Sequence, residues 1–161
     1  MTPATLLRLL ALFWALLLFA VPAHASPAER ALSRLCPHAM HLAPLVEQAS
    51  RRHMVHPAQL VAVVASESHC DDVAENARTG ARGLGQILPN GSAARGYEPF
   101  HLWDAATNLD ATARHLARLS VWCGCFGGVV RVYHGHRSPK GWRHDRHVQR
   151  VLALLARCYH G

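Results

Sequence analysis

The stretch from His56 to Cys70, HPAQLVAVVASESHC, decides the fold that this sequence predicts. Pro57 suits a first helical turn, because the N–H that proline lacks would have no helical partner there. Four of the residues that follow recur at the spacing of one helical stripe: Leu60, Val63, Val64 and Glu67. The stripe is apolar except for its last member. The spacing therefore predicts a helix over residues 57–67 with a lone carboxyl group on its interior face, at its C-terminal end.

Two effects act on the Glu67 carboxyl group in that position. Burial disfavours the charged carboxylate, because the charge loses its water. The negative end of the helix dipole disfavours the charge further. We therefore expect Glu67 to keep its proton as a carboxylic acid, the form that can protonate a glycosidic oxygen. The structural alternative is that Glu67 reaches solvent or pairs with an arginine.

Outside this helix, Gly and Pro divide the chain into further helix-length pieces, and no stretch alternates with the period of a strand. The 161 residues favour a single domain. The expected fold is mostly α, one domain of packed helices. Helices are predicted over residues 42–53, 104–122 and 145–158, with a short helix or turn over 129–134. Residues 123–128 are expected to form a turn, and residues 91–103 to be irregular.

The first 25 residues have the layout of a secretory signal peptide. Residues 6–21 are almost wholly apolar, with Arg8 near their start, and the small residues Ala23 and Ala25 follow. This run is shorter than the roughly 20 residues that span a bilayer. We expect a signal peptide over residues 1–25 and a folded domain over 26–161, exported to the periplasm or outside the cell. An uncleaved membrane anchor is the alternative.

Charge and cysteine content fit an exported protein. The formal net charge of +7 suits an anionic partner, but the basic residues are scattered without interleaved aromatics, which argues against nucleic acid. Export permits disulfides among the five cysteines: Cys36, Cys70, Cys123, Cys125 and Cys158. The sequence does not define their connectivity. We favour Cys36 with Cys158, tying the two ends, and Cys70 with Cys123 or Cys125.

Histidines and cysteines crowd the last third of the chain. The pairs are His134-x-His136, His144-x-x-His147 and Cys123-x-Cys125. None of them completes a familiar zinc-binding spacing, so we expect no metal and no other cofactor. The alternative to a metal site is a solvated basic loop whose charge rises below about pH 6.5.

Five segments, taken together and in order, resemble the lytic transglycosylase family of the lysozyme-like superfamily. They are VHPAQLVAVVASESHC (Val55–Cys70), GARGLGQILP (Gly80–Pro89), NLDATARHLARL (Asn108–Leu119), VRVYHG (Val130–Gly135) and RHVQRVLAL (Arg146–Leu154). The resemblance covers about residues 36–156. It implies a lysozyme-like catalytic domain with a substrate cleft, an enzyme that cleaves the glycan strands of peptidoglycan.

The resemblance also implies roles for single residues. Glu67 matches the catalytic acid/base, and Tyr133 matches a tyrosine whose hydroxyl points toward the catalytic carboxyl. The residues expected to bind substrate are Ser68, Gly83, Leu84, Gln86, Ile87, Tyr133 and His134. Gly83 and Leu84 have structural alternatives as a tight turn and a core residue. Asn108 matches an asparagine that opens a helix, and we expect it to hold the helix start in place.

Four positions depart from the family pattern. Ala77 stands where a serine is common, and it lacks the hydroxyl that could contact the substrate or the catalytic acid. Gly85 stands where the family has methionine, which would open space in the cleft. His134 stands where an asparagine is usual, so an imidazole replaces the amide at a position that contacts sugar in the family. His147 aligns with the tyrosine of the closing segment.

The mechanism implied by the resemblance needs one carboxyl group, whereas most glycosidases use two. Asp71 and Asp72 follow Glu67 closely, but we expect them to be a solvated loop pair. Glu67 would cleave the bond between N-acetylmuramic acid and N-acetylglucosamine and leave 1,6-anhydro ends. The alternatives are a hydrolytic muramidase and a catalytically weak peptidoglycan-binding module. The short chain and the early Cys36 also resemble specialised members that serve a secretion, conjugation or pilus apparatus.

Overall fold

The computed structural model describes residues 25–159, so nearly all of the predicted signal peptide lies outside the described residues. The helices are α2 (Pro27–Leu35), η1 (Pro37–Leu42), α3 (Ala43–His53), α4 (Pro57–Ser68), η2 (Ser92–Ala94), η3 (Pro99–Trp103), α5 (Ala105–Cys123), α6 (Phe126–Tyr133), η4 (Trp142–His144) and α7 (Arg146–Arg157). Strands β1 (Glu75–Asn76) and β2 (Ala81–Arg82) form one small antiparallel pair. The fold is mostly α, as predicted. Within residues 25–159, no helix has both the length and the apolar character needed to cross a membrane.

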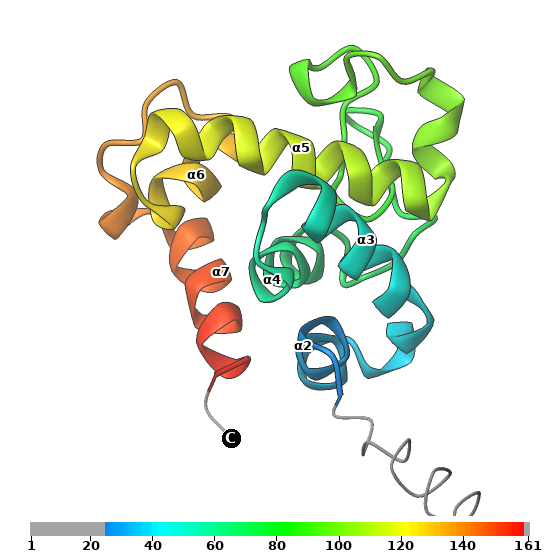
Figure 1. The fold of residues 1–161 in the computed structure, drawn as a ribbon. Coiled ribbons are helices and arrows are strands. Elements are labelled where there is room, and N and C mark those ends of the chain that lie inside the picture. Colours follow the sequence, from blue (N-terminus) through cyan, green and yellow to red (C-terminus); the bar gives the residue numbers. More distant parts are fainter. Residues whose placement is uncertain (1–24, 160–161) are drawn as a thin grey trace, which may run out of the picture.

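Helix α4 lies near the centre of the fold and packs against α2, α3 and α7 (Figure 1). Its residues from Leu60 to Val64 are all buried, whichever side of the helix they occupy. The predicted single apolar stripe was therefore too narrow, because Val61 and Ala62 are as deeply buried as the stripe itself. A helix enclosed on every side can present a polar group only at its ends.

The predicted helices over 42–53, 57–67, 104–122 and 145–158 are confirmed as α3, α4, α5 and α7, with ends that differ by at most one residue. The turn predicted over 123–128 is wrong from Phe126 onward, where α6 begins. Gly127 and Gly128 are helical there because their missing side chains leave room for Trp142 and Pro139. A Cβ atom on Gly127 would lie 2.5 Å from the Trp142 ring.

Sequence reasoning missed helix α2. Ser26 begins it with a capping box: the Ser26 hydroxyl accepts from Glu29 N at 3.1 Å, and Ser26 N donates to the Glu29 carboxylate at 2.6 Å. The signal was present as Ser-Pro-Ala-Glu at residues 26–29. Ala28, Ala31 and Leu32 then bury one face of the helix in the core.

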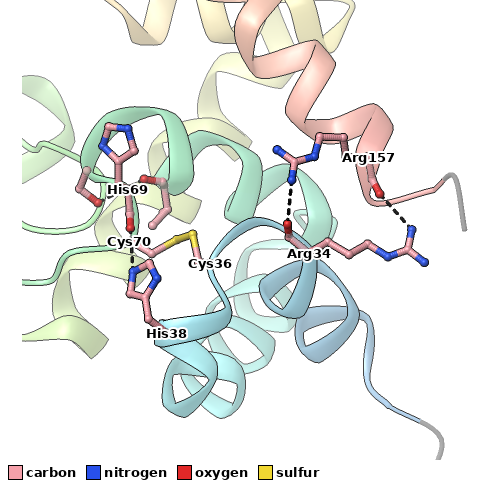
Figure 2. The surroundings of a disulfide bond; sticks show 8 residues. Arg34, Cys36, His38, His69, Cys70 and Arg157 are labelled. Atoms are coloured by element: carbon pink, nitrogen blue, oxygen red, sulfur yellow. Dashed lines mark hydrogen bonds between the residues drawn. A yellow bond between two sulfur atoms is a disulfide. The ribbon is translucent and has the colours of Figure 1, made fainter.

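The predicted cysteine pairing is wrong. Cys36, which follows α2, is joined by a disulfide to Cys70, which follows α4 (Figure 2), while Cys123, Cys125 and Cys158 are free thiols. The ends of the fold are tied by arginines instead. Arg34 of α2 donates to the Arg157 carbonyl at 2.9 Å, and Arg157 of α7 donates to the Arg34 carbonyl at 3.1 Å (Figure 2). Cys70 is the cysteine that reaches Cys36 because α4 packs beside α2.

Asn108, in the first turn of α5, fastens the loop after β2 to that helix. Asn108 as a whole is 1% exposed. The Oδ1 atom accepts from Gly85 N at 2.8 Å, and Nδ2 donates to the carbonyls of Arg82 (2.9 Å) and Leu102 (2.8 Å). The helix cap itself is Asp104, which accepts from Thr107 N. Asn108 thus holds the loop against the helix, and every polar atom of its amide carries a contact.

Gly85 does not open space, contrary to the expectation from its replacement of methionine. A Cβ atom built there would lie 1.9 Å from Thr112 Oγ1 and 2.8 Å from the Tyr133 hydroxyl. The volume beside Gly85 is filled by these two side chains. Glycine is needed so that α5 and α6 can approach the loop backbone.

Gly85→Ala is expected to lower the free energy of unfolding by about 1–3 kcal/mol, the usual cost of overpacking a buried site. Denaturant unfolding of the purified protein measures it. Thr112→Ala removes the nearest clashing atom, so the double variant should lose less than the sum of the two single variants. Unchanged stability in Gly85→Ala, or strict additivity, would show that the side chains around Gly85 are not closely packed.

Asp110 joins α5 to α3 and to the loop before η3. Its carboxylate lies 3.1 Å from Arg52 Nη1 and 2.9 Å from His53 Nε2, and it accepts a hydrogen bond from the Tyr97 hydroxyl. Burial raises the pKa of Asp110, but the bonds from Tyr97, His53 and Arg52 outweigh it and hold the pKa below its ordinary value. Burial and the same carboxylate raise the pKa of Tyr97 to about 12.

A carboxyl group whose pKa is lowered by folding stabilises the fold above its unfolded pKa, near 3.9. That contribution is lost as the pH falls through the lower, folded pKa. Asp110→Asn should therefore cost about 1–3 kcal/mol of unfolding free energy near pH 7. The gap between wild type and variant should close below about pH 4. Chemical unfolding across this pH range measures the gap, with Asp72→Asn as the control. A gap that does not change with pH would contradict the assignment.

Candidate functional site

Glu67 lies at the C-terminal end of α4, where the spacing of its stripe predicts it. The helix ends just beyond it, because His69 and Cys70 take left-handed backbone conformations that turn the chain away. The Glu67 side chain is 14% exposed. The carboxyl group thus sits at the boundary between the core and the solvent, carried by a helix that the fold holds on all sides.

Two histidines face this carboxyl group from other elements. His147 Nε2, in the first turn of α7, lies 3.3 Å from Glu67 Oε1, and His134 Nδ1, just after α6, lies 4.0 Å from it. The two imidazole rings are stacked, with centroids 3.7 Å apart and planes 11° from parallel. Burial and the neighbouring His147 lower the pKa of His134 and outweigh the opposite effect of Glu67. His134 is therefore uncharged near neutral pH.

Asp145 holds α6 and α7 together behind the histidines. Its carboxylate accepts from His147 N (3.0 Å) and Val148 N (3.3 Å) at the start of α7. It also pairs with Arg131 of α6 at 2.7 Å and with His136 at 3.1 Å. Burial raises the pKa of Asp145, but these donors outweigh it and lower the pKa. A single charged carboxylate thus sets the position of the backbone that carries His147.

Tyr133, the last residue of α6, also approaches Glu67. Its hydroxyl donates to the Gly85 carbonyl at 2.6 Å. This differs from the implied orientation, in which the hydroxyl points toward the catalytic carboxyl. Burial raises the pKa of Tyr133, and the negative charge of Glu67 raises it further. The phenol therefore stays protonated and joins α6 to the loop that Asn108 holds.

A pocket of about 210 Å³ lies beside Tyr133, and residues 86–93 form one wall of it. Gln86 lines this pocket and takes a left-handed conformation. Its amide donates to the carbonyls of Ala74 (3.2 Å) and Gly83 (3.1 Å). These bonds use the NH₂ group within the loop and leave the amide oxygen for other contacts.

His115 also lines the pocket, and sequence reasoning missed it. Burial lowers its pKa to about 4, with help from Arg118 and Arg114, so the ring is neutral at ordinary pH. Its ring packs against Tyr133 with centroids 5.5 Å apart. The helical spacing of Asn108, Thr112 and His115 is the signal that could have found it, because these three residues share one face of α5.

The remaining predicted substrate-binding residues face the interior. Ser68 is buried and its hydroxyl donates to the Val64 carbonyl at 3.2 Å. Leu84 and Ile87 are buried core residues, and Ile87 also lines the pocket beside Tyr133. Gly83 is buried against Asn108. Their roles in substrate binding stay predictions. Because the side chains are buried, contacts with substrate would come mainly from backbone atoms. Asp71 is exposed and accepts from Val73 N within its own turn, whereas Asp72 is half-buried, so the expected solvated position is found for Asp71 alone.

The fold thus gathers Glu67, Tyr133, His134 and the unpredicted His147 at one place, with Gln86 and His115 in the adjoining pocket. Glu67 is the acidic member of this group and can give or take a proton. Glu67, His134 and His147 each offer one ligand atom, and these atoms lie within 4.8 Å of one another, close enough to hold a metal ion.

Comparisons with known proteins place the chain in a family. No curated protein matches the chain at a significant level. The family model described as the transglycosylase SLT domain matches residues 44–135, more than half of the chain. The matched part contains Glu67, Gln86 and Tyr133, and it ends before His147. The chain therefore belongs to the SLT family of lytic transglycosylases, within the lysozyme-like superfamily.

Proposed function

We propose that this protein is a peptidoglycan lytic transglycosylase that uses Glu67 first as an acid and then as a base. The family acts on peptidoglycan, so the substrate class follows from membership. The observation that carries the proposal is the position of Glu67. Its side chain, 14% exposed, lies at the end of a buried helix, and the carboxyl group faces the histidine pair. A carboxyl held in this way has a defined direction and limited access to water, two properties of a general acid.

The reaction begins with proton transfer from Glu67 to the oxygen between N-acetylmuramic acid and N-acetylglucosamine. The bond between that oxygen and the anomeric carbon of N-acetylmuramic acid then breaks. The 2-acetamido group of the muramic acid residue stabilises the cationic carbon. Glu67, now a carboxylate, takes the proton from the 6-hydroxyl of the same sugar. The 6-oxygen then bonds to the anomeric carbon and closes a 1,6-anhydro ring. Glu67 has regained its proton, and no water is consumed.

Two other acids near the site are already bonded to other groups, which supports this one-carboxyl route. Asp145, whose charge acts on the same histidine as Glu67, is occupied by Arg131, His136 and the start of α7. Asp71 is exposed and accepts a hydrogen bond within its own turn. A retaining or inverting glycosidase needs a second carboxyl group at a defined distance from the first. Neither of these acids is poised for that task.

We also propose that the protein works outside the cytoplasm, in the periplasm or beyond. The layout of residues 1–25 and the formal net charge of +7 support this location, because peptidoglycan is an exported, anionic polymer. An envelope apparatus as partner stays a prediction.

Glu67→Gln keeps the shape of the side chain and removes its acidic proton. We expect the release of soluble fragments from purified peptidoglycan to fall by at least about 100-fold, the range that a general acid–base contributes. Thermal unfolding should change little, because the Glu67 side chain accepts no hydrogen bond from any other residue within 25–159. Glu98→Gln, at an exposed position, serves as the matched control and should keep full activity. Retained activity in Glu67→Gln would reject the assignment.

The products distinguish the proposed reaction from hydrolysis. Mass spectrometry of fragments released by the wild-type protein should show 1,6-anhydro-muramyl ends, which lack one water relative to reducing ends. Reducing ends would identify the protein as a hydrolytic muramidase on the same fold. Binding of glycan strands without any product would instead identify a binding module.

A further inference from the structure

Three donor groups that are distant in sequence meet at the end of α4. Glu67 comes from that helix, His134 from the residue after α6, and His147 from the first turn of α7. The ligand atoms of all three lie within 4.8 Å of one another. This cluster includes the proposed acid, but neither imidazole takes part in the proton transfers of the proposed reaction. Their convergence on one carboxylate oxygen therefore calls for a chemical explanation.

We propose that Glu67, His134 and His147 form a binding site for a divalent transition-metal ion of the Zn²⁺ type. The ion would switch the enzyme off by occupying the carboxyl group that acts as the acid. Only this second, inhibitory part rests on the proposed function. The metal site itself stands on the geometry of the three donors.

The donor set selects the class of ion. Two imidazole nitrogens and one carboxylate oxygen form a recurrent three-ligand set for Zn²⁺, with a fourth position left to water. Mg²⁺ and Ca²⁺ prefer sites made of oxygen atoms. No thiol takes part, so the soft ligands that favour Cu(I) are absent from the cluster. Zn²⁺ and its spectroscopic substitute Co²⁺ fit the set.

The distances come close to those of a metal site. Ligands at about 2.0–2.1 Å from a tetrahedral ion lie roughly 3.4 Å from one another. Glu67 Oε1 and His147 Nε2 are already 3.3 Å apart, whereas His134 Nδ1 is 4.0 Å from the same oxygen. The rings are stacked, so one must turn before both nitrogens point at one ion. The His134 side chain is 45% exposed, and it follows a helix end, so it has the freedom to turn.

His147 supplies the fixed half of the site. Its side chain is 13% exposed, and Nε2 is a buried nitrogen without a hydrogen bond. The Glu67 oxygen lies near this nitrogen, but the direction between them does not make a hydrogen bond. Buried polar atoms are rarely left without a partner. An ion between His147 and Glu67 would satisfy both atoms, and Asp145 already holds the His147 backbone in place.

Coordination and acid catalysis are incompatible at Glu67. A metal ligand must be deprotonated, and a carboxylate bonded to an ion has no proton to give to a glycosidic oxygen. Occupancy should therefore suppress cleavage, and removal of the ion should restore it. The protein would then be active in the metal-free state and silent when the ion is abundant.

The test uses the full chain, without a histidine tag, stripped of metal by a chelator and then titrated with Co²⁺. We expect one equivalent to bind with visible absorption bands of a four- or five-coordinate ion, and Zn²⁺ to displace it. His134→Ala and His147→Ala should each weaken binding at least tenfold, since even outer-shell changes cost about 10- to 100-fold. Thermal unfolding without metal checks that each variant folds. If His147→Ala does not fold, His134→Ala alone tests the site, because the His134 side chain is partly exposed.

Two controls test other donors. His144→Ala removes an exposed histidine that lies outside the cluster in the same segment. The double variant Cys123→Ser, Cys125→Ser removes the two thiols that line a separate pocket with Trp142. Both variants should bind Co²⁺ as the wild type does. Loss of binding in either control, or retained binding in both histidine variants, would overturn the proposed site.

Activity completes the experiment and separates the two proposals. Saturating Zn²⁺ should abolish the release of soluble peptidoglycan fragments, and chelator should restore it. If metal-free protein cleaves peptidoglycan through Glu67 but binds no Co²⁺ at the cluster, the metal site is wrong and the proposed function stands. If Co²⁺ binds through the histidines but Glu67→Gln stays active, the metal site stands and the proposed function is wrong. Binding at the cluster without loss of wild-type activity would overturn the inhibitory part alone.

Discussion

The rest of the structure depends on the burial of the central turns of α4, from Leu60 to Ala65. Because α2, α3 and α7 pack around this helix, its side chains make the centre of the core. Each of these side chains has to be apolar or small, and a charged group can be tolerated only where the helix reaches its end. Glu67 occupies that end. The burial of α4 stabilises the domain, and it also fixes the direction and the exposure of the Glu67 carboxyl group.

Buried polar side chains then bring the other elements to Glu67. Asn108 holds the loop of residues 82–85 to α5 with two hydrogen bonds, and Tyr133 joins α6 to the same loop. Asp145 couples α6 to α7 through Arg131. In each case a hydrogen bond that is shielded from water holds together elements that are distant in sequence. Such supporting hydrogen bonds keep the side chains of a site in the geometry that its chemistry needs.

The sequence predicted the long helices well, because their apolar spacing and capping residues are local signals. It failed where packing outweighs local preference. Gly127 and Gly128 look like a turn, yet they are helical because Trp142 and Pro139 lie against them. Gly85 looks like added space, yet Thr112 and Tyr133 fill it. The disulfide could not be predicted, since pairing depends on which helix ends meet and not on the spacing of the cysteines.

What the sequence by itself determined is the mostly α fold, the carboxyl group at the end of the central helix, and the ordered segments of an SLT transglycosylase. These features follow from helical periodicity and motif order, which can be recognised in the linear sequence. Only the tertiary structure decided that His134 and His147 stack beside Glu67, and that Ser68, Leu84 and Ile87 face the core. The physical reason is that α4, α6 and α7 converge through packing and buried hydrogen bonds, and no local pattern records which side chains then meet.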